Sequence, residues 1–327
     1  MKSSLTPQPP PFSPFRRLFP SASVLLLLFS LGYIAGFLSA TTSPPNPQQQ
    51  PLLRDSSSSQ SPENCLRPPP PPHDLLRFRA HCADPIPQTL VIQTILDRLF
   101  NGSSPYAGFP SRETASFLLP PAARPRGWGS TNPVFSDLIS SLRPLTIIEL
   151  GSFLGASALH MASLTHNLSL PSLILCLDDF RGWPDLRRSR RLGRHLPPIH
   201  HADSLLLQQF MANVAAAGES GRIVPVPFST SSALAALCNW GVYGDLIEVD
   251  AGHDFHSAWS DINMAYAVLR PGGVLFGHDY HTSADERGVR RAVTLFAKVN
   301  GLNLRAHGEH WVLSSKPKES VSVELPP

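Results

Sequence analysis

Residues 145–158, L-T-I-I-E-L-G-S-F-L-G-A-S-A, join an apolar run to a turn with two glycines and a helix of small residues. The apolar run 145–148 predicts a buried parallel strand, and the turn begins at Glu149. Gly151 and Gly155 in this turn would let backbone N–H groups approach a ligand closely. The segment therefore predicts an α/β domain with a ligand site at the end of this strand.

A second apolar run, residues 173–177, ends at Asp178. In an open α/β sheet the carboxyl ends of neighbouring strands form one crevice, so Asp178 is expected beside the glycine turn. A glycine turn and an acid at neighbouring strand ends are the two halves of a nucleoside site, in which the acid accepts hydrogen bonds from ribose hydroxyls. The spacing E-x-G-x-x-x-G is neither the dinucleotide motif G-x-G-x-x-G nor a P-loop ending in G-K-S/T. An ordinary glycine turn in an α/β domain is the alternative interpretation.

The charge of the chain is close to balanced, with 27 Lys and Arg against 24 Asp and Glu among 327 residues. The basic residues are dispersed, apart from the cluster at 181–194. This distribution does not predict nucleic acid as a partner. The arginine cluster is interpreted as a solvated face, or as a contact for an acidic polysaccharide or lipid headgroups.

The first 73 residues differ in composition from the rest of the chain. Residues 1–20 are polar and basic and predict a cytoplasmic tail, and residues 21–40 carry no charge and predict a transmembrane signal anchor. Residues 41–73, rich in Pro, Ser and Gln, predict a disordered stem. These segments predict a single-pass membrane protein of the Golgi or endoplasmic reticulum with a lumenal domain. A signal peptide cleaved at Ala40 and a transit peptide are the alternatives.

The four cysteines and two sequons bear on the same topology. Cys176 and Cys238 lie in apolar segments and are expected to be buried thiols. Cys65 and Cys82 could pair if the region lies in an oxidising lumen, although the sequence does not determine pairing. The glycosylation sequons, beginning at Asn101 and Asn167, would be relevant only in a lumenal domain.

Residues 74–316 alternate between apolar runs and helical patterns, which predicts a mostly parallel, doubly wound sheet, with residues 317–327 as a disordered tail. The expected strands are 145–148, 173–177, 223–226, 245–250, 274–277 and a final antiparallel pair, 302–305 and 311–313. The expected helices are 88–100, 203–217, 257–269, one that begins at Asn132-Pro133, and one that opens with a capping box at 283–286 and ends at Gly301.

Five motifs occur in the order typical of one enzyme group. They are E-L-G-S-F-L-G-A-S, L-D-D-F-x-G, D-L-I-E-V-D-A-G-H, L-R-P-G-G-V-L-F-G-H-D-Y and G-V-R-R-A-V. This set resembles class I S-adenosylmethionine methyltransferases of the macrocin O-methyltransferase and cephalosporin-hydroxylase-like group, and is most similar to plant membrane-anchored members. The resemblance covers about residues 90–314 and implies a seven-stranded, Rossmann-like methyltransferase sheet.

The resemblance also implies a cofactor site and a catalytic site. S-adenosylmethionine would contact Glu149, Gly151 and Gly155 through its methionine and ribose part, and Asp178 through its ribose hydroxyls. Thr230 or Ser231 would lie near its adenine. Metal-dependent relatives have acids after the fourth and fifth strands, which correspond here to Asp250 and Asp279. Relatives often have a second acid directly before the latter, where this chain has His278, and this difference puts a bound metal in doubt.

The expected chemistry is methyl transfer to a hydroxyl group, which has to lose a proton. His253, His256, His278 and His281 cluster around the two strand ends, so a histidine is a candidate base. Asp250 and Asp279 are the candidate ligands for Mg²⁺ or Mn²⁺, which would lower the pKa of the hydroxyl. Trp128 and Trp183 are candidates for lining the acceptor site.

The predicted function is O-methylation of a glycan or a small hydroxylated molecule in the secretory pathway. A methyltransferase-like protein that binds a partner without turnover is the main alternative, because His278 replaces an acid. A glycosyltransferase shares the anchor, stem and lumenal domain, but the chain lacks an Asp-x-Asp motif for the metal of a nucleotide sugar.

Overall fold

The computed structural model describes residues 81–109, 127–183, 186, 199–200 and 203–318. Helices within these ranges are too short or too polar to cross a membrane. The predicted tail, anchor and stem at residues 1–73, and most of the arginine cluster, lie outside the described residues and stay predictions.

A seven-stranded sheet forms the centre of the described domain, in the order β5-β2-β1-β6-β7-β9-β8. The five strands from β5 to β7 pair in parallel, and β9 pairs antiparallel with both β7 and β8. This arrangement confirms the predicted doubly wound sheet with an antiparallel edge. The strands are β1 (Thr146–Leu150), β2 (Leu173–Leu177), β5 (Ile223–Val226), β6 (Gly244–Val249), β7 (Leu269–Gly277), β8 (Leu304–His307) and β9 (His310–Leu313).

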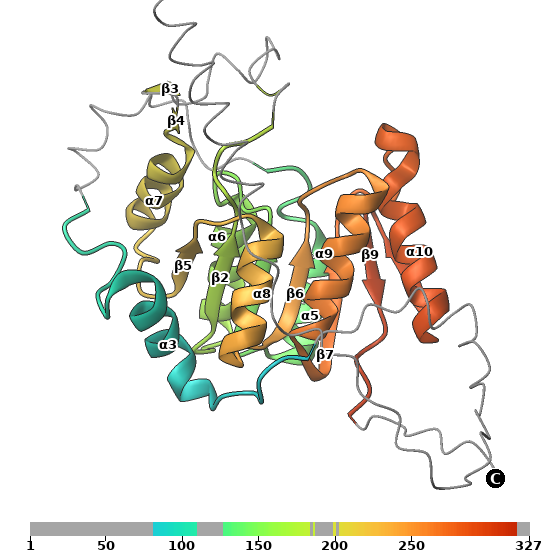
Figure 1. The fold of residues 1–327 in the computed structure, drawn as a ribbon, viewed down its shortest axis with the longest axis horizontal. Coiled ribbons are helices and arrows are strands. Elements are labelled where there is room, and N and C mark those ends of the chain that lie inside the picture. Colours follow the sequence, from blue (N-terminus) through green and yellow to red (C-terminus); the bar gives the residue numbers. More distant parts are fainter. Residues whose placement is uncertain (1–80, 110–126, 184–185, 187–198, 201–202, 319–327) are drawn as a thin grey trace, which may run out of the picture. The chain divides into compact units, whose positions relative to one another are not determined.

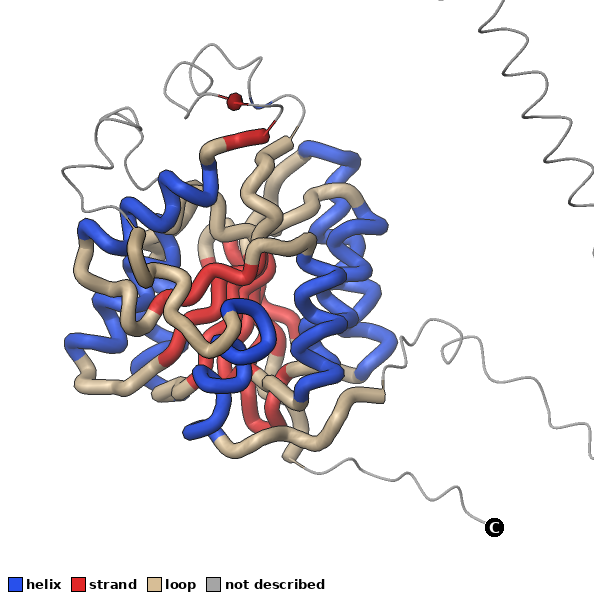
Figure 2. The backbone as a smooth tube through the Cα atoms, turned by 60° about the vertical axis from the view of Figure 1, so that its left-hand side comes forward, coloured by secondary structure: helices blue, strands red, loops and turns tan. Residues whose placement is uncertain are grey.

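Helices cover both faces of the sheet (Figures 1 and 2). They bury its apolar side chains. Alternate residues of each parallel strand point to opposite faces, so the central strands are apolar on both sides. One face packs against α5 (Pro133–Leu142), α6 (Ala156–Asn167) and α7 (Leu206–Ala216). The other packs against α3 (Gln88–Phe100), α8 (Thr230–Trp240), α9 (Phe255–Ala267) and α10 (Gly288–Asn300).

The strand order reverses between β1 and β6, because the chain first builds β2 and β5 on one side of β1 and then returns to the other side. Ligands of such sheets bind at the carboxyl ends of the strands at this switch point. Gly151, which follows β1, has a φ of +87°, and a Cβ there would collide with the backbone carbonyl of Asp250 after β6. The glycine turn and the end of β6 therefore lie in direct contact.

Most predicted elements are found within a few residues of their expected bounds. The strands 173–177 and 223–226 and the helix 88–100 match β2, β5 and α3. Asn132 caps α5 by accepting a hydrogen bond from the Val134 N–H at 3.2 Å, as its position before a proline predicts. Strand β7 begins earlier than expected, because the segment 270–273 continues the strand with a shift in its register to β6.

Two predicted helix starts are wrong. The helix expected at 203–217 begins at Leu206, because Asp203–Ser204 pairs as strand β4 with β3 (Ile199–His200). The capping box at 283–286 does not form: the Ser283 side chain makes no cap, and a 3₁₀ turn, η3 (Ala284–Arg287), precedes α10. Helix α10 starts at Gly288, where any Cβ would meet the backbone at Asp254 and Phe255, so close packing decides the start.

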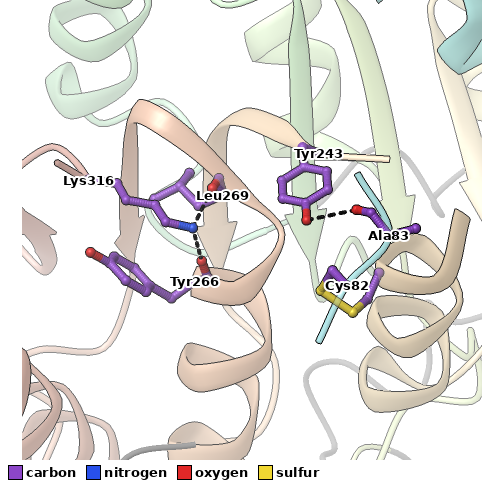
Figure 3. Close-up of a disulfide and its surroundings, with 7 residues drawn as sticks. Cys82, Ala83, Tyr243, Tyr266, Leu269 and Lys316 are labelled. Atoms are coloured by element: carbon purple, nitrogen blue, oxygen red, sulfur yellow. Dashed lines mark hydrogen bonds between the residues drawn. A yellow bond between two sulfur atoms is a disulfide. The ribbon is translucent and has the colours of Figure 1, made fainter. Parts of the chain in front are cut away.

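The cysteine prediction is also corrected. Cys238 of α8 is not a free thiol, because it forms a disulfide with Cys82, 156 residues away in sequence (Figure 3). The segment that carries Cys82 is fixed further by a hydrogen bond of 3.1 Å from the Tyr243 hydroxyl to the Ala83 carbonyl. Cys176 is the buried free thiol that was predicted, and Cys65 lies outside the described residues. The disulfide links the segment before α3 covalently to the C-terminal part of α8.

Candidate active site

The glycine turn brings Glu149 and the start of α6 together. The Glu149 side chain is buried and accepts a hydrogen bond from the Ser157 hydroxyl, whereas its Oε2 has no partner. The buried Ser152 hydroxyl lies near the Glu149 carboxyl and the Cys176 thiol but makes no hydrogen bond of good geometry. Helix α6 begins after Gly155, which has a φ of +84° and offers no side-chain cap, so the first N–H groups of the helix are free for an anion.

Asp178, at the end of β2, connects two loops of the site. Its Oδ2 accepts from the Phe153 N–H in the glycine turn at 2.8 Å, and its Oδ1 accepts from the Phe180 N–H at 2.7 Å. Burial raises the pKa of Asp178, and these two hydrogen bonds oppose the rise. Each carboxylate oxygen keeps a second lone pair, so a ribose hydroxyl can still donate to it. Asp178 thus has a structural role that the sequence did not predict.

Glu248 is a site residue that sequence reasoning missed. It lies beside Glu149 in the register of β1 and β6, it is buried, and its Oε2 has no hydrogen-bond partner. Burial, followed by the charges of Glu149 and Asp250, raises the pKa of Glu248 well above its ordinary value, which favours the neutral acid. The sequence signal for Glu248 is an acid inside the apolar run L-I-E-V. A charged side chain is unfavourable there, because such a strand is buried on both faces.

Thr230 and Ser231 open α8 after β5, at the carboxyl edge of the sheet where they were expected. The Thr230 hydroxyl donates to Asp261 of α9 at 2.7 Å, so it fixes the two helices to each other. Ser231 is exposed. The contact of these residues with an adenine ring stays a prediction. The exposed Ser231 hydroxyl is more accessible to a ligand than the Thr230 hydroxyl, which is engaged by Asp261.

The two strand-end acids converge with two histidines. The Nε2 atom of His253 lies 3.0 Å from Oδ2 of Asp279 and 3.9 Å from Oδ1 of Asp250. The Nδ1 atom of His278 lies 3.4 Å from Oδ2 of Asp279 and 3.9 Å from Oδ1 of Asp250. We call these four residues the carboxylate–histidine cluster. His256 and His281 are exposed and pack on neighbouring aromatic rings, so they stand outside it.

Opposite charges within the carboxylate–histidine cluster shift the pKa values of its members. The carboxylates of Asp250 and Asp279 raise the pKa of His253 to about 10, and the contact with Asp279, at 3.0 Å, is within hydrogen-bond distance. Burial alone would lower the pKa of His278, but the two carboxylates outweigh it and raise this pKa. Burial alone would raise the pKa of Asp279, but hydrogen bonds from both histidines hold it well below its usual range. At neutral pH His253 therefore keeps its proton, and Asp279 is the more tightly engaged carboxylate.

The residues present fit the two groups that the resemblance implies. The unpartnered Glu149 oxygen and Ser152 hydroxyl suit an ammonium group, and the free start of α6 suits a carboxylate, so this end of the site suits the amino-acid part of S-adenosylmethionine. Asp250, His253 and Asp279 offer ligand atoms that all lie within 4.8 Å of one another. Two carboxylates and an imidazole suit Mn²⁺ better than Mg²⁺.

Several solved structures are similar to the chain at less than 20% sequence identity. Cofactor-bound Rv0187 from MTB is 17% identical, over 72% of this chain and 100% of that one, with a TM-score of 0.44. The O-methyltransferase TomG from Streptomyces achromogenes, in complex with SAM, is 14% identical, over 71% and 99%, with a TM-score of 0.42. The O-methyltransferase from Bacillus cereus, in complex with SAH, is 18% identical, over 68% and 96%, with a TM-score of 0.41. No curated protein sequence matches the chain.

A family model described as a methyltransferase domain matches residues 148–280. The matched range runs from β1 to the residue after Asp279, so it contains the glycine turn, Asp178 and the carboxylate–histidine cluster. The sequence-based prediction of a methyltransferase with S-adenosylmethionine as its cofactor is thereby confirmed, and the site described above lies within this methyltransferase domain.

Proposed function

We propose that this protein transfers a methyl group from S-adenosylmethionine to a hydroxyl group of a glycan or a small molecule. The observation that carries the proposal is the contact between the glycine turn and the end of β6, which places a cofactor-type turn next to Asp250 inside a methyltransferase domain. The oxygen acceptor is inferred from the carboxylates of the cluster, because a hydroxyl has to lose a proton during methyl transfer and a carboxylate can accept it.

On the donor side, the protein mainly has to hold the cofactor. Glu149 and Ser152 would bind the ammonium group, the start of α6 would bind the carboxylate, and Asp178 would accept from the ribose. The bound cofactor supplies an activated methyl group, so positioning an acceptor in line with it provides much of the rate. Burial raises the pKa of both Glu149 and Glu248, so negative charge on both of these paired acids at once is disfavoured.

On the acceptor side, Asp250 is the residue most free to receive a proton. Both histidines lie 3.9 Å from its Oδ1, whereas Asp279 holds its histidines at 3.0 and 3.4 Å. We infer that the acceptor hydroxyl donates to Asp250 while His253 and His278 stabilise the negative charge. Asp250 and Asp279 would hold a divalent cation, and His253 would become the third ligand on losing its proton when the metal binds. The cation would lower the pKa of the hydroxyl when bound.

Methyl transfer to a panel of hydroxylated acceptors tests the proposal. Full-length protein in detergent would be incubated with S-adenosylmethionine that carries a labelled methyl group, together with glycans and small ring alcohols. We expect label on an acceptor oxygen, located by mass spectrometry. Label on nitrogen or carbon, or transfer of sugar from a nucleotide sugar, would contradict the proposed reaction.

Replacement of Asp178 by alanine is expected to weaken S-adenosylmethionine binding by about 1–3 kcal/mol, the range for hydrogen bonds to a charged group. The variant loses an acceptor for the ribose and also the tie between two loops. Calorimetry measures the change, and Asp179→Ala, at the exposed neighbouring acid, is the matched control. Unchanged affinity in a folded Asp178→Ala protein would remove Asp178 from the cofactor site.

We further propose that the protein is a membrane-anchored member of the macrocin-type group with its domain in the lumen of the secretory pathway. The disulfide between Cys82 and Cys238 supports this location, because disulfides are rare in the reducing cytosol. The uncharged segment 21–40 supports an anchor. In sealed microsomes the domain should resist added protease until detergent is present. Digestion without detergent would show the opposite orientation.

A further inference from the structure

Three aromatic rings gather at the glycine turn, and the function proposed so far does not use them. Trp128, Phe153 and Trp183 come from three separate segments, and their ring centroids lie 5.8 to 6.1 Å apart. We call these residues the aromatic cluster. Trp128 is 49% exposed and Trp183 is 45% exposed, although such rings are usually highly buried. An exposed group of large apolar rings beside a reaction site marks a binding surface.

The backbone fixes Trp128 next to the carboxylate–histidine cluster. It stands between Gly127 and Gly129. A Cβ on Gly129, which has a φ of +65°, would come within 2.6 Å of Nε2 of His278, and a Cβ on Gly127 would come within 3.3 Å of Cβ of Ala156 in α6. The two glycines therefore let this segment lie against both the catalytic and the cofactor side of the site. Trp128 is held between these two sides.

Asp178 fixes the other two rings. Phe153 has a φ of 45°, an unfavourable conformation for a residue with a side chain, and its N–H donates to Asp178. The loop that leads to Trp183 is held by the same carboxylate through the Phe180 N–H. Strained backbone persists where its surroundings enforce it, and it is concentrated at functional sites. The aromatic cluster is thus built into the site and is not a loose surface feature.

The chemistry of the cluster indicates what it binds. The ring planes are inclined to one another by 32° to 60°, so the cluster offers tilted faces and no parallel slot. The faces of aromatic rings carry partial negative charge and attract C–H groups and ring edges. A neutral ring with an apolar C–H face matches these tilted aromatic faces.

We propose that the aromatic cluster binds the methyl acceptor, and that this acceptor is a hydroxylated ring whose apolar face packs on Trp128 and Trp183 while its hydroxyl points to Asp250. The inference rests on the proposed function and gives it a substrate class. Both a phenolic ring and a pyranose sugar have this combination of a flat C–H face and neighbouring hydroxyls.

Binding to full-length protein saturated with S-adenosylhomocysteine tests the inference without requiring turnover. The probes are catechol, methyl β-glucopyranoside and the acyclic propane-1,2-diol, which all carry neighbouring hydroxyls. We expect at least one ring probe to bind about tenfold more tightly than the diol, the effect of one good aromatic contact. The ratio of the two ring affinities identifies the phenolic or the sugar class. Equal binding of rings and diol would overturn the inference.

Variants separate an acceptor site from a cofactor site. Trp128→Ala and Trp183→Ala should each weaken the binding of ring probes by about tenfold and keep the affinity for S-adenosylmethionine. Trp128→Phe and Trp183→Phe should retain much of the affinity for ring probes, because they keep an aromatic face. Leu90→Ala, at an equally exposed apolar residue on α3 (51%), is the control and should change neither. Loss of S-adenosylmethionine affinity with ring binding intact would assign the rings to the cofactor and contradict the inference. If no form of the protein binds S-adenosylmethionine, the proposed function fails instead.

Discussion

Asp250→Asn and Asp279→Asn are each expected to lower methyl transfer by roughly 100-fold or more, while S-adenosylmethionine binding is kept. Asparagine preserves the shape of the side chain but removes the negative charge. Asp250→Asn would remove the group that receives the hydroxyl proton. Asp279→Asn would leave His253 and His278 beside a neutral amide in place of their closest carboxylate, at 3.0 and 3.4 Å, so their positive charges would lose that compensation. Single-turnover transfer and calorimetry, measured on the same preparations, separate the two effects.

Asp137→Asn is the matched control for these variants. Asp137 also pairs with a histidine, His307, at 2.9 Å, but its side chain is 59% exposed and lies outside the cluster. A chelator arm separates the two possible roles of the acids. If they hold a cation, chelation should abolish transfer in the parent and Mn²⁺ or Mg²⁺ should restore it. Methyl transfer that resists chelation would mean that residues of the cluster accept the hydroxyl proton without a metal. Full activity in both Asn variants would refute the mechanism.

Removal of the Cys82–Cys238 disulfide is expected to lower the free energy of unfolding by about 2–5 kcal/mol. The bond closes a loop between residues 156 positions apart, which restricts the unfolded chain. It also secures the segment whose Ala83 N–H donates to the Cys238 carbonyl at 2.9 Å and whose Ile86 N–H donates to the Gly241 carbonyl at 2.9 Å. Urea unfolding of the parent and of the Cys82→Ser/Cys238→Ser variant measures the loss.

Reductant supplies the internal control for this prediction. It should destabilise the parent and leave the double variant unchanged. Peptide mapping without reduction should recover Cys82 linked to Cys238. A Cys82 peptide linked to Cys65, or equal stability of the parent and the double variant, would contradict the assignment.

The sheet could be predicted from the sequence because parallel strands that are buried on both faces consist of short apolar runs. Strands 173–177 and 223–226 match their predictions for this reason. The meeting of Asp250 and Asp279 was also predictable, because neighbouring parallel strands end at the same edge of a sheet. For these features, the local apolar pattern and the parallel topology are sufficient to predict the structure.

The features that were missed depend on contacts between residues that are distant in sequence. No local pattern pairs Cys82 with Cys238, because the chain between them has to fold before the sulfur atoms meet. The capping box at 283–286 fits a known pattern, yet the close approach of Gly288 to the turn at Asp254 decides where α10 begins. The role of Asp178 in holding Phe153 likewise requires the loop conformation to be known.

Calorimetric titration of the full-length protein in detergent, first with S-adenosylmethionine and separately with a nucleotide sugar, determines whether the protein is a methyltransferase or a glycosyltransferase. We expect one molecule of S-adenosylmethionine bound per chain and no heat from the nucleotide sugar. Saturable binding of the nucleotide sugar, with none of S-adenosylmethionine, would contradict it.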